Sequence, residues 1–207
     1  MNFNSVLGKV WLSKNFNEET VKFLKSNFSL SEILSRLIAI RKIKLEDVNL
    51  FLNPKLKNML PNPFILKDME KSVDRTIKTI LSNEKIGIFG DYDVDGATST
   101  ALLGNYFNQI DRKISIYIPD RKSEGYGPSN NGFAKLISGG AKIIFTVDCG
   151  TLSFKTIDYS QNKKIDVIVL DHHQSETRLP NAFSIVNPNR FDDNSKLNYL
   201  CAAGVCF

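Results

Sequence analysis

Cysteine and long apolar runs are scarce in this sequence of 207 residues. The 3 cysteines (Cys149, Cys201 and Cys206) are odd in number and contain no C-x-x-C pair, which excludes a disulfide framework and a zinc knuckle. No apolar run approaches the roughly 18 residues that a transmembrane helix needs, and the N-terminus has no signal-peptide cleavage site. We therefore expect a cytoplasmic protein with free thiols and no membrane partner.

Basic residues outnumber acidic residues by 27 to 22, which gives a formal charge of +5. Part of the acidic content is concentrated in three short segments, which contain Asp91, Asp93, Asp95, Asp148 and Asp171. Outside these segments 17 acidic residues stand against 27 basic ones. An acidic pocket on an otherwise basic protein is expected of a metal site that acts on phosphates. Scattered, solvated lysines explain the excess of basic residues equally well.

Two hydrophobic patterns divide the sequence near residue 83. Residues 1–83 predict a small helical lead-in, because apolar residues follow the helical period after Ser29–Glu32, which has the S-x-x-E form of a helix start, and again over 45–52 and 69–81. Residues 84–207 alternate short β-rich runs with helix-length segments. This alternation predicts an α/β fold with a doubly wound parallel sheet.

Acidic residues follow the predicted strands of this sheet. The predicted strands are Ile86–Phe89, Ile114–Ile118, Ile143–Val147 and Ile165–Leu170, and the predicted helices are Ala97–Asn108, Asn131–Ser138 and Leu152–Gln161. In open α/β sheets, ligands bind outside the carboxyl ends of the strands. The aspartates after the first, third and fourth strands are therefore expected to form one site.

Residues 90–96 read Gly-Asp-Tyr-Asp-Val-Asp-Gly and place three carboxylates, Asp91, Asp93 and Asp95, at alternate positions. In an extended chain all three point to one side, where they repel each other unless a cation or a helix N-terminus neutralises them. A bound divalent cation is one explanation, and a helix cap with a solvated acidic turn is the other. An EF-hand is excluded, because the twelfth position from Asp91 is Leu102 instead of glutamate.

The two histidines of the chain are adjacent, in Asp171-His172-His173 after a predicted strand. Carboxylates with one or two imidazoles suit Mn²⁺ or Mg²⁺, and the imidazoles favour Mn²⁺. Two such ions, roughly 3.5 to 4 Å apart, are a common device for displacement at phosphorus. Asp148 offers a further carboxylate that could bridge them, or it ends a strand at a simple turn.

The Gly-rich loop of residues 121–128 offers cations and an aromatic ring. Arg121 could contact phosphate and Tyr126 could contact a base or sugar, or the segment is an ordinary mobile loop. The sequence has no Walker A motif, no G-x-G-x-x-G and no nucleophile elbow. These absences disfavour nucleotide-hydrolysing motors, dinucleotide oxidoreductases and α/β-hydrolases.

Three motifs in this order resemble the DHH phosphoesterase superfamily: residues 90–98, Val147-Asp148-Cys149-Gly150, and Asp171-His172-His173. The part of the helical lead-in from Leu30 to Asp68, the 121–127 loop and residues 186–190 and 200–205 are similar to the RecJ family of single-stranded-DNA-specific exonucleases within it. The resemblance implies stepwise 5′ to 3′ hydrolysis of single-stranded DNA by a metal-activated water, in DNA repair and recombination. It also implies that Asp93, Asp95, Asp148 and His172 ligate Mn²⁺ or Mg²⁺, and that Asp91, Asp171 and His173 are ligands or partners of ligands.

Proteins of that family continue to a fourth motif with another metal-binding aspartate, then to a DHHA1 domain and an oligonucleotide-binding fold. None of the acidic residues after Asp171, which are Glu176, Asp192 and Asp193, matches the fourth motif. The sequence therefore predicts a truncated or split member, with a DHH-type domain over residues 84–207 that is incomplete at its C-terminus. A separately encoded C-terminal half, a catalytically disabled remnant, and activity on oligonucleotides or cyclic dinucleotides are the alternatives.

Overall fold

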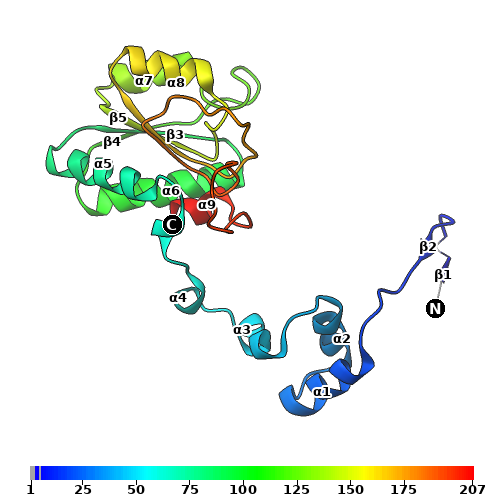
Figure 1. The fold of residues 1–207 in the computed structure, drawn as a ribbon. Coiled ribbons are helices and arrows are strands. Elements are labelled where there is room, and N and C mark those ends of the chain that lie inside the picture. The colour runs from blue at the N-terminus through cyan, green and yellow to red at the C-terminus, as the bar shows by residue number, and fades with distance from the viewer. Residues whose placement is uncertain (1–2, 5) are drawn as a thin grey trace. The chain divides into compact units, whose positions relative to one another are not determined.

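The computed structural model describes residues 3–4 and 6–207, and Figure 1 shows its elements. The chain falls into two compact units, Met1–Leu60 and Pro61–Phe207. Helix α5 (Met69–Leu81) lies in the second unit, where Met69 and Ile80 pack against the core of the sheet. The domain boundary expected at residue 83 stays a prediction. Across the described ranges, none of the helices has both the length and the apolar character of a membrane span.

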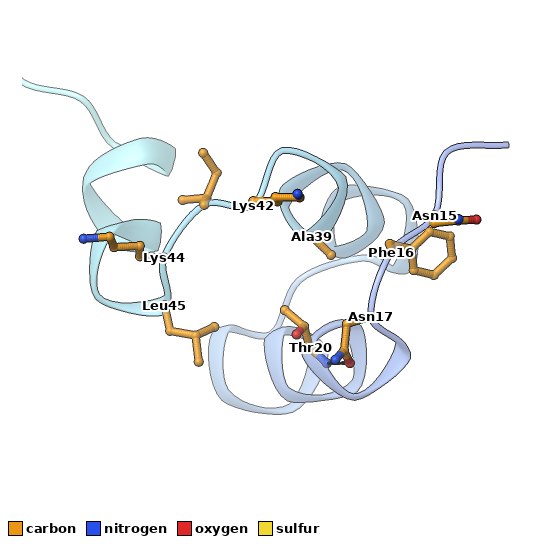
Figure 2. A pocket seen from close by; sticks show the side chains of 9 residues that line it. Asn15, Phe16, Asn17, Thr20, Ala39, Lys42, Lys44 and Leu45 are labelled. Carbon is orange, nitrogen blue, oxygen red and sulfur yellow. Dashed lines mark hydrogen bonds between the residues drawn. The ribbon is translucent and has the colours of Figure 1, made fainter.

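The first unit consists of short elements. They are β1 (Phe3–Asn4), β2 (Val10–Trp11), α1 (Glu18–Phe28), α2 (Glu32–Ile40), the 3₁₀ helix Leu45–Asp47, α3 (Val48–Leu52) and α4 (Leu56–Met59). Strands β1 and β2 pair in antiparallel fashion. Leu24, Ile38 and Val48 form the buried core of this unit. A cavity of about 650 Å³ lies beside α1 and the end of α2, and none of the predicted site residues lines it (Figure 2).

The start of α2 differs from its prediction from sequence. Ser31, not Ser29, is the N-cap, and its hydroxyl accepts a hydrogen bond from the Leu34 N–H at 3.3 Å. Ser29 instead ends α1 in the left-handed conformation, with φ of 53°. The hydrophobic pattern does not predict α1. Residues 29–32 contain both the end of α1 and the start of α2, whereas the S-x-x-E pattern predicts only a helix start.

The second unit is an α/β structure built on a five-stranded sheet in the order β4-β3-β5-β6-β7, with every neighbouring pair parallel. Its strands are β3 (Ile86–Gly90), β4 (Ile114–Tyr117), β5 (Ile143–Val147), β6 (Asp166–Leu170) and β7 (Ser184–Val186). Its other helices are the 3₁₀ helix Pro63–Ile65, α6 (Val94–Gln109), α7 (Asn130–Ser138), α8 (Phe154–Asn162) and α9 (Ala202–Cys206). Helices α7 and α8 cover one face, and α5, α6 and α9 cover the other (Figure 1). The doubly wound fold predicted from the sequence is confirmed.

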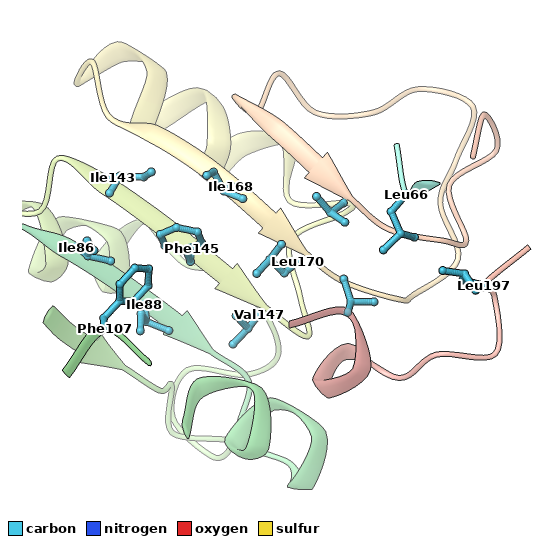
Figure 3. Close-up of a cluster of buried hydrophobic side chains, with 12 residues drawn as sticks. Leu66, Ile86, Ile88, Phe107, Ile143, Phe145, Val147, Ile168, Leu170 and Leu197 are labelled. Carbon is cyan, nitrogen blue, oxygen red and sulfur yellow. The ribbon is translucent and has the colours of Figure 1, made fainter. Parts of the chain in front are cut away.

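The central strands are apolar on both sides because helices cover both faces of the sheet. Every residue of β3 and β5 is buried. Ile88, Val147 and Ile168 belong to a cluster on the face of α5 and α6 (Figure 3), whereas Phe89 and Ile144 belong to a second cluster on the face of α7 and α8. Burial on both faces fixes the register of these strands and the position of the loops that follow them.

Successive strands are added to the sheet first on one side of β3 and then on the other. Strand β4 lies on one side of β3, and β5, β6 and β7 follow on the other side. A crevice at the carboxyl ends of the strands is expected at such a switch point. The loops after β3 and β5 therefore meet where an α/β fold of this order presents its ligand site.

Strand β7, which the sequence did not predict, has its outer edge closed by side chains. The Ile185 N–H donates to Asp68 Oδ2 at 3.2 Å, and Arg190 Nη1 donates to the Ile185 carbonyl at 2.6 Å. Arg190 also pairs with Asp68 at 2.7 Å. These contacts satisfy backbone groups that would otherwise be free to pair with another strand.

Candidate metal centre

The loop after β3 places two carboxylates beside the start of α6. Asp93 is the N-cap of α6, and its Oδ1 accepts a hydrogen bond from the Gly96 N–H at 3.0 Å, which lowers the pKa of Asp93. Asp91 is only 2% exposed, and burial raises its pKa even though the Tyr92 N–H donates to it. Gly96 is required here, because a Cβ on it would lie 2.6 Å from the Asp91 carbonyl oxygen.

The extended spacing predicts that Asp95 points to the same side as Asp91 and Asp93, but the chain is not extended at Asp95. Helix α6 begins at Val94, so Asp95 occupies the first helical turn and turns toward α9. Its two carboxylate oxygens accept hydrogen bonds from the N–H groups of Ala202 and Ala203, both at 2.8 Å. Asp95 Oδ2 also lies 3.5 Å from His172 Nε2, so this carboxylate joins α9 to the edge of the site.

Asp148 is the most unusual carboxylate of the site. It follows β5 in the left-handed conformation, with φ of 60°, and is 1% exposed. Both of its carboxylate oxygens are buried without a hydrogen-bond partner among the described residues. Burial, together with the Asp95 and Asp93 carboxylates, raises the pKa of Asp148 to about 8. Its nearest ionisable neighbour among the histidines is His172, whose Nε2 lies 3.3 Å from Asp148 Oδ1. A buried carboxylate that accepts no hydrogen bond is costly, and a bound cation is the ordinary way to compensate it.

Asp171 holds the two histidines in place. Its Oδ1 accepts from the backbone N–H groups of His172 and His173 at 2.7 and 3.2 Å and lies 2.7 Å from His173 Nδ1, while its Oδ2 accepts from the Thr151 N–H at 3.0 Å. Burial favours the protonated acid, but the hydrogen bonds from His173 and Thr151 outweigh it and lower the pKa of Asp171 to about 2. The same bond raises the pKa of His173. Asp171 is therefore an ionised anchor for the histidine loop.

Two asparagines support this loop from the segment after β7. Buried Asn187 donates to the His173 carbonyl at 2.9 Å and to the Thr151 hydroxyl at 2.8 Å. Asn189 donates to the His172 carbonyl and gives its own N–H to Asn187 Oδ1. Reasoning from the sequence did not assign roles to Asn187, Asn189 or Thr151. The two asparagines fall in residues 186–190, which carry part of the family resemblance, but nothing in that pattern indicates which backbone groups they bind.

Two groups of potential metal ligands meet at the carboxyl ends of β3, β5 and β6. Asp91, Asp93 and Asp148 form the first, Asp148, His172 and His173 form the second, and the ligand atoms within each lie within 4.8 Å of one another. Asp148 belongs to both groups. The structure thus brings together five of the seven predicted metal-site residues, while Asp95 and Asp171 lie beside them, bound to backbone amides.

The loop after β4 brings the two predicted substrate-binding residues to this edge. The Tyr126 hydroxyl lies 3.4 Å from the Asp148 carbonyl and from the ring nitrogens of His173, and the two rings meet edge to face. Burial and the surrounding carboxylates raise the pKa of Tyr126. Arg121 lies over the Tyr92 ring, with its guanidinium carbon 5.4 Å from the ring centre. Tyr126 therefore lies beside Asp148 and His173, and Arg121 lies beside Tyr92, which follows Asp91 in the chain.

Comparison with curated proteins gives eight similar sequences, which include the following two. The single-stranded-DNA-specific exonuclease RecJ of Bacillus subtilis (strain 168) is 32% identical over 198 residues, which are 95% of this chain and 25% of that protein. The protein of the same name from Escherichia coli (strain K12) is 35% identical over 179 residues, which are 86% of this chain and 30% of that protein. The chain thus spans about a quarter to a third of the length of these relatives.

A solved structure and a family model agree with these similarities. The crystal structure of an exonuclease RecJ bound to manganese has a TM-score of 0.63 and 27% identity, and the match covers 71% of this chain and 36% of that one. The model of the DHH family, N-terminal domain, matches residues 85–207, which include the whole sheet and every carboxylate of the site. Because this match covers more than half of the sequence, the chain belongs to the DHH family.

Proposed function

We propose that the carboxyl edge of this sheet binds two divalent cations, Mn²⁺ or Mg²⁺, and that the site hydrolyses phosphodiester bonds. The observation that carries the proposal is Asp148, which belongs to both ligand groups and whose two buried oxygens accept no hydrogen bond from the described chain. The group that lies beside it is the His172 ring, with Nε2 3.3 Å from Asp148 Oδ1, and that ring is itself a potential metal ligand. Carboxylate oxygens with imidazole nitrogens are a donor set that suits these ions. The relative whose crystal structure contains manganese supports the choice of metal.

Each residue of the site has a distinct part in this proposal. Asp91 and Asp93 would hold one ion with Asp148, and His172 and His173 would hold the other with Asp148. Asp171 orients His173 through the Nδ1 contact, and such hydrogen bonds fix the tautomer and orientation of a ligating imidazole. When bound, the ions supply an activated water and stabilise charge on the phosphate oxygens.

The proposed substrate is single-stranded DNA, degraded stepwise from its 5′ end. The two curated relatives described as single-stranded-DNA-specific exonucleases support this substrate. Arg121 would bind a backbone phosphate and Tyr126 would pack against a sugar or base, which the contact of Tyr126 with Asp148 and the position of Arg121 over Tyr92 support. A single strand exposes both kinds of group at once, whereas a duplex stacks its bases inside.

We include in this proposal a role in DNA repair and recombination in the cytoplasm, as the resemblance of the sequence implies. We also include a partner segment that corresponds to the remaining length of the relatives and completes the activity. The small share of each relative that this chain covers supports such a segment. Adding that segment as a separate polypeptide should raise the rate of cleavage and yield a stable complex.

The test is degradation of 5′-labelled single-stranded and duplex DNA with Mn²⁺, by this chain with and without the partner segment. Cleavage of the single strand, lost at least about 100-fold in Asp93→Ala, is expected because that variant removes one ligand. Asp158→Ala, an exposed aspartate on α8, is the matched control and should keep the rate. Equal rates in Asp93→Ala and wild type, or no cleavage by the folded chain even with the partner segment, would refute the proposal.

A further inference from the structure

Three lysines stand in register at the amino ends of neighbouring parallel strands. Lys113, Lys85 and Lys142 immediately precede β4, β3 and β5. The backbone connects them directly, because the Ile86 N–H donates to the Lys113 carbonyl at 3.1 Å and the Lys142 N–H donates to the Lys85 carbonyl at 2.9 Å. Neighbouring strands lie about 4.8 Å apart, so this lysine row places three like charges side by side.

The side chains of the lysine row share one face of the sheet. Each lysine of the row comes just before an isoleucine that packs on the face of α5 and α6, as Lys85 does before Ile86. Because successive side chains of an extended chain point to opposite faces, the lysines lie on the face of α7 and α8. Lys113 and Lys142 are exposed and Lys85 is half-buried. In the described part of the chain none of the three forms an ion pair, whereas Arg75 and Arg190 each bind two carboxylates.

The charges of the second unit are unevenly distributed between the two ends of its sheet. This unit contains 17 basic and 17 acidic residues, but five of its aspartates gather at the carboxyl ends of β3, β5 and β6. The rest of the unit therefore carries a positive excess, and the row lies at the opposite edge from the aspartates. Lys163 and Lys164, which are exposed just before β6, extend the positive region along that edge.

We propose that the lysine row is a secondary binding site for the phosphate backbone of single-stranded DNA, away from the reacting phosphate. Like charges on directly opposite residues destabilise a sheet unless negative charges neutralise them. The consecutive phosphates of a DNA backbone are a row of negative charges that can do so. The choice of single-stranded DNA as the ligand rests on the proposed function. The lysine row would hold a distant part of a long substrate while the carboxyl edge holds its end.

The row also lies near the C-terminal ends of helices, where cations favour the helix dipole. Helix α7 ends at Ser138 and α8 ends at Asn162, shortly before two of the strands that the positive region precedes. A purely structural role predicts a loss of stability on lysine removal with no change in DNA binding. The two roles are therefore separated by measuring affinity together with thermal stability.

The experiment uses the triple variant Lys85→Gln, Lys113→Gln, Lys142→Gln and an oligothymidylate of about 30 nucleotides, with binding followed by fluorescence anisotropy in EDTA over a series of salt concentrations. The matched control is Lys71→Gln, Lys155→Gln, Lys196→Gln, which removes three exposed lysines from elsewhere in the same unit. The row variant should bind about tenfold more weakly at low salt, and the slope of log affinity against log salt should fall by about 2.

Equal effects in the row variant and the control, or wild-type affinity and slope in the row variant, would overturn the proposal. Should the row variant unfold, Lys113→Gln, Lys142→Gln retains half-buried Lys85 and should lower the slope by about 1.4. Mn²⁺-dependent cleavage by wild type, measured on the same preparation, reports on the proposed function separately. Absence of cleavage even after the partner segment is added refutes that function, while the anisotropy result still decides the lysine row.

Discussion

The side chain of Asp148 is held in an environment that is unfavourable to its charge. The left-handed backbone at Asp148 and the turn at Gly150, where φ is 115° and a Cβ would lie 2.4 Å from Thr146 Oγ1, aim the carboxylate into the protein. Neighbouring Asp171 is equally buried, but it accepts hydrogen bonds from Thr151 and from the histidines. Two aspartates of similar burial therefore have opposite effects on the stability of the metal-free chain.

Asp148→Asn should raise the free energy of unfolding of the metal-free chain at neutral pH by about 1 to 3 kcal/mol, because the buried aspartate must be kept protonated above its ordinary pKa and the neutral amide carries no such cost. Asparagine also tolerates the left-handed backbone. The matched variant Asp171→Asn should lower the free energy of unfolding by about 2 kcal/mol, because it weakens several hydrogen bonds to an ionised group. Urea unfolding in EDTA measures both, and a loss of stability in Asp148→Asn would contradict the account.

The pH dependence of stability has a sign that follows from the same contacts. The pKa of Asp148 is raised to about 8 from 3.8, so the folded metal-free chain binds a proton that the unfolded chain releases. The stabilising effect of that proton is lost as the pH rises from about 4 to about 8. Subtracting the profile of Asp148→Asn from that of wild type should show this decline, and a flat difference would be inconsistent with the raised pKa.

The residue types of the site could be predicted from the sequence, but their partners could not. Aspartates and histidines after apolar strands indicate a metal site wherever parallel strands end together. The partners of Asp95 are the amides of Ala202 and Ala203, which lie more than 100 positions later in the chain. No local spacing carries that information, so the sequence could not separate Asp95 from Asp93.

At the scale of elements, the start of α6 depends on close packing of backbone against backbone. Gly96→Ala would place a Cβ 2.6 Å from the Asp91 carbonyl oxygen, and a backbone atom cannot give way easily. The free energy of unfolding should fall by about 2 kcal/mol. Gly104→Ala, on the same helix, meets only Ile116 and Ile114 at 3.4 and 3.7 Å and should be neutral or stabilising by up to about 1 kcal/mol. Equal destabilisation of both variants, measured by urea unfolding, would contradict this packing.

Helix α9 depends on the carboxylate of Asp95. Asp95→Ala removes the acceptor for the Ala202 and Ala203 amides, so their hydrogen exchange should become about tenfold faster, as expected for loss of one charged hydrogen bond. Asp158→Ala, exposed on α8, is the control and should leave the exchange of α9 unchanged. Unchanged exchange of α9 in Asp95→Ala would show that packing alone holds this helix.

Elements with long apolar runs were predictable, and those made by tertiary contacts were not. Strands β3 and β5 are fully buried and lie within one residue of their predicted bounds. Strand β7 has only three residues, and it pairs with β6 while Asp68 and Arg190 close its outer edge. Three residues carry too little periodicity to indicate a strand, so β7 forms because β6 and these side chains are present.

At the scale of the whole molecule, the order of the strands places the site. Because β4 and β5 flank β3 on opposite sides, the loops after β3, β4 and β5 converge with the histidine loop after β6. The alternation of strands and helices in the sequence predicts a parallel sheet, and the switch point follows from the strand order. The charges divide along the same axis, with carboxylates at the carboxyl edge and the lysine row at the amino edge.

The binding stoichiometry of Mn²⁺, measured by titration calorimetry on the metal-free chain, tests the central claim most directly. The account predicts two ions for each wild-type chain, one ion for Asp93→Ala, and none bound tightly by Asp148→Asn, because Asp148 belongs to both ligand groups. The control Asp158→Ala should bind as wild type does. Failure of the folded wild-type chain to bind Mn²⁺, or two ions bound by Asp148→Asn, would contradict a shared metal centre at this edge of the sheet.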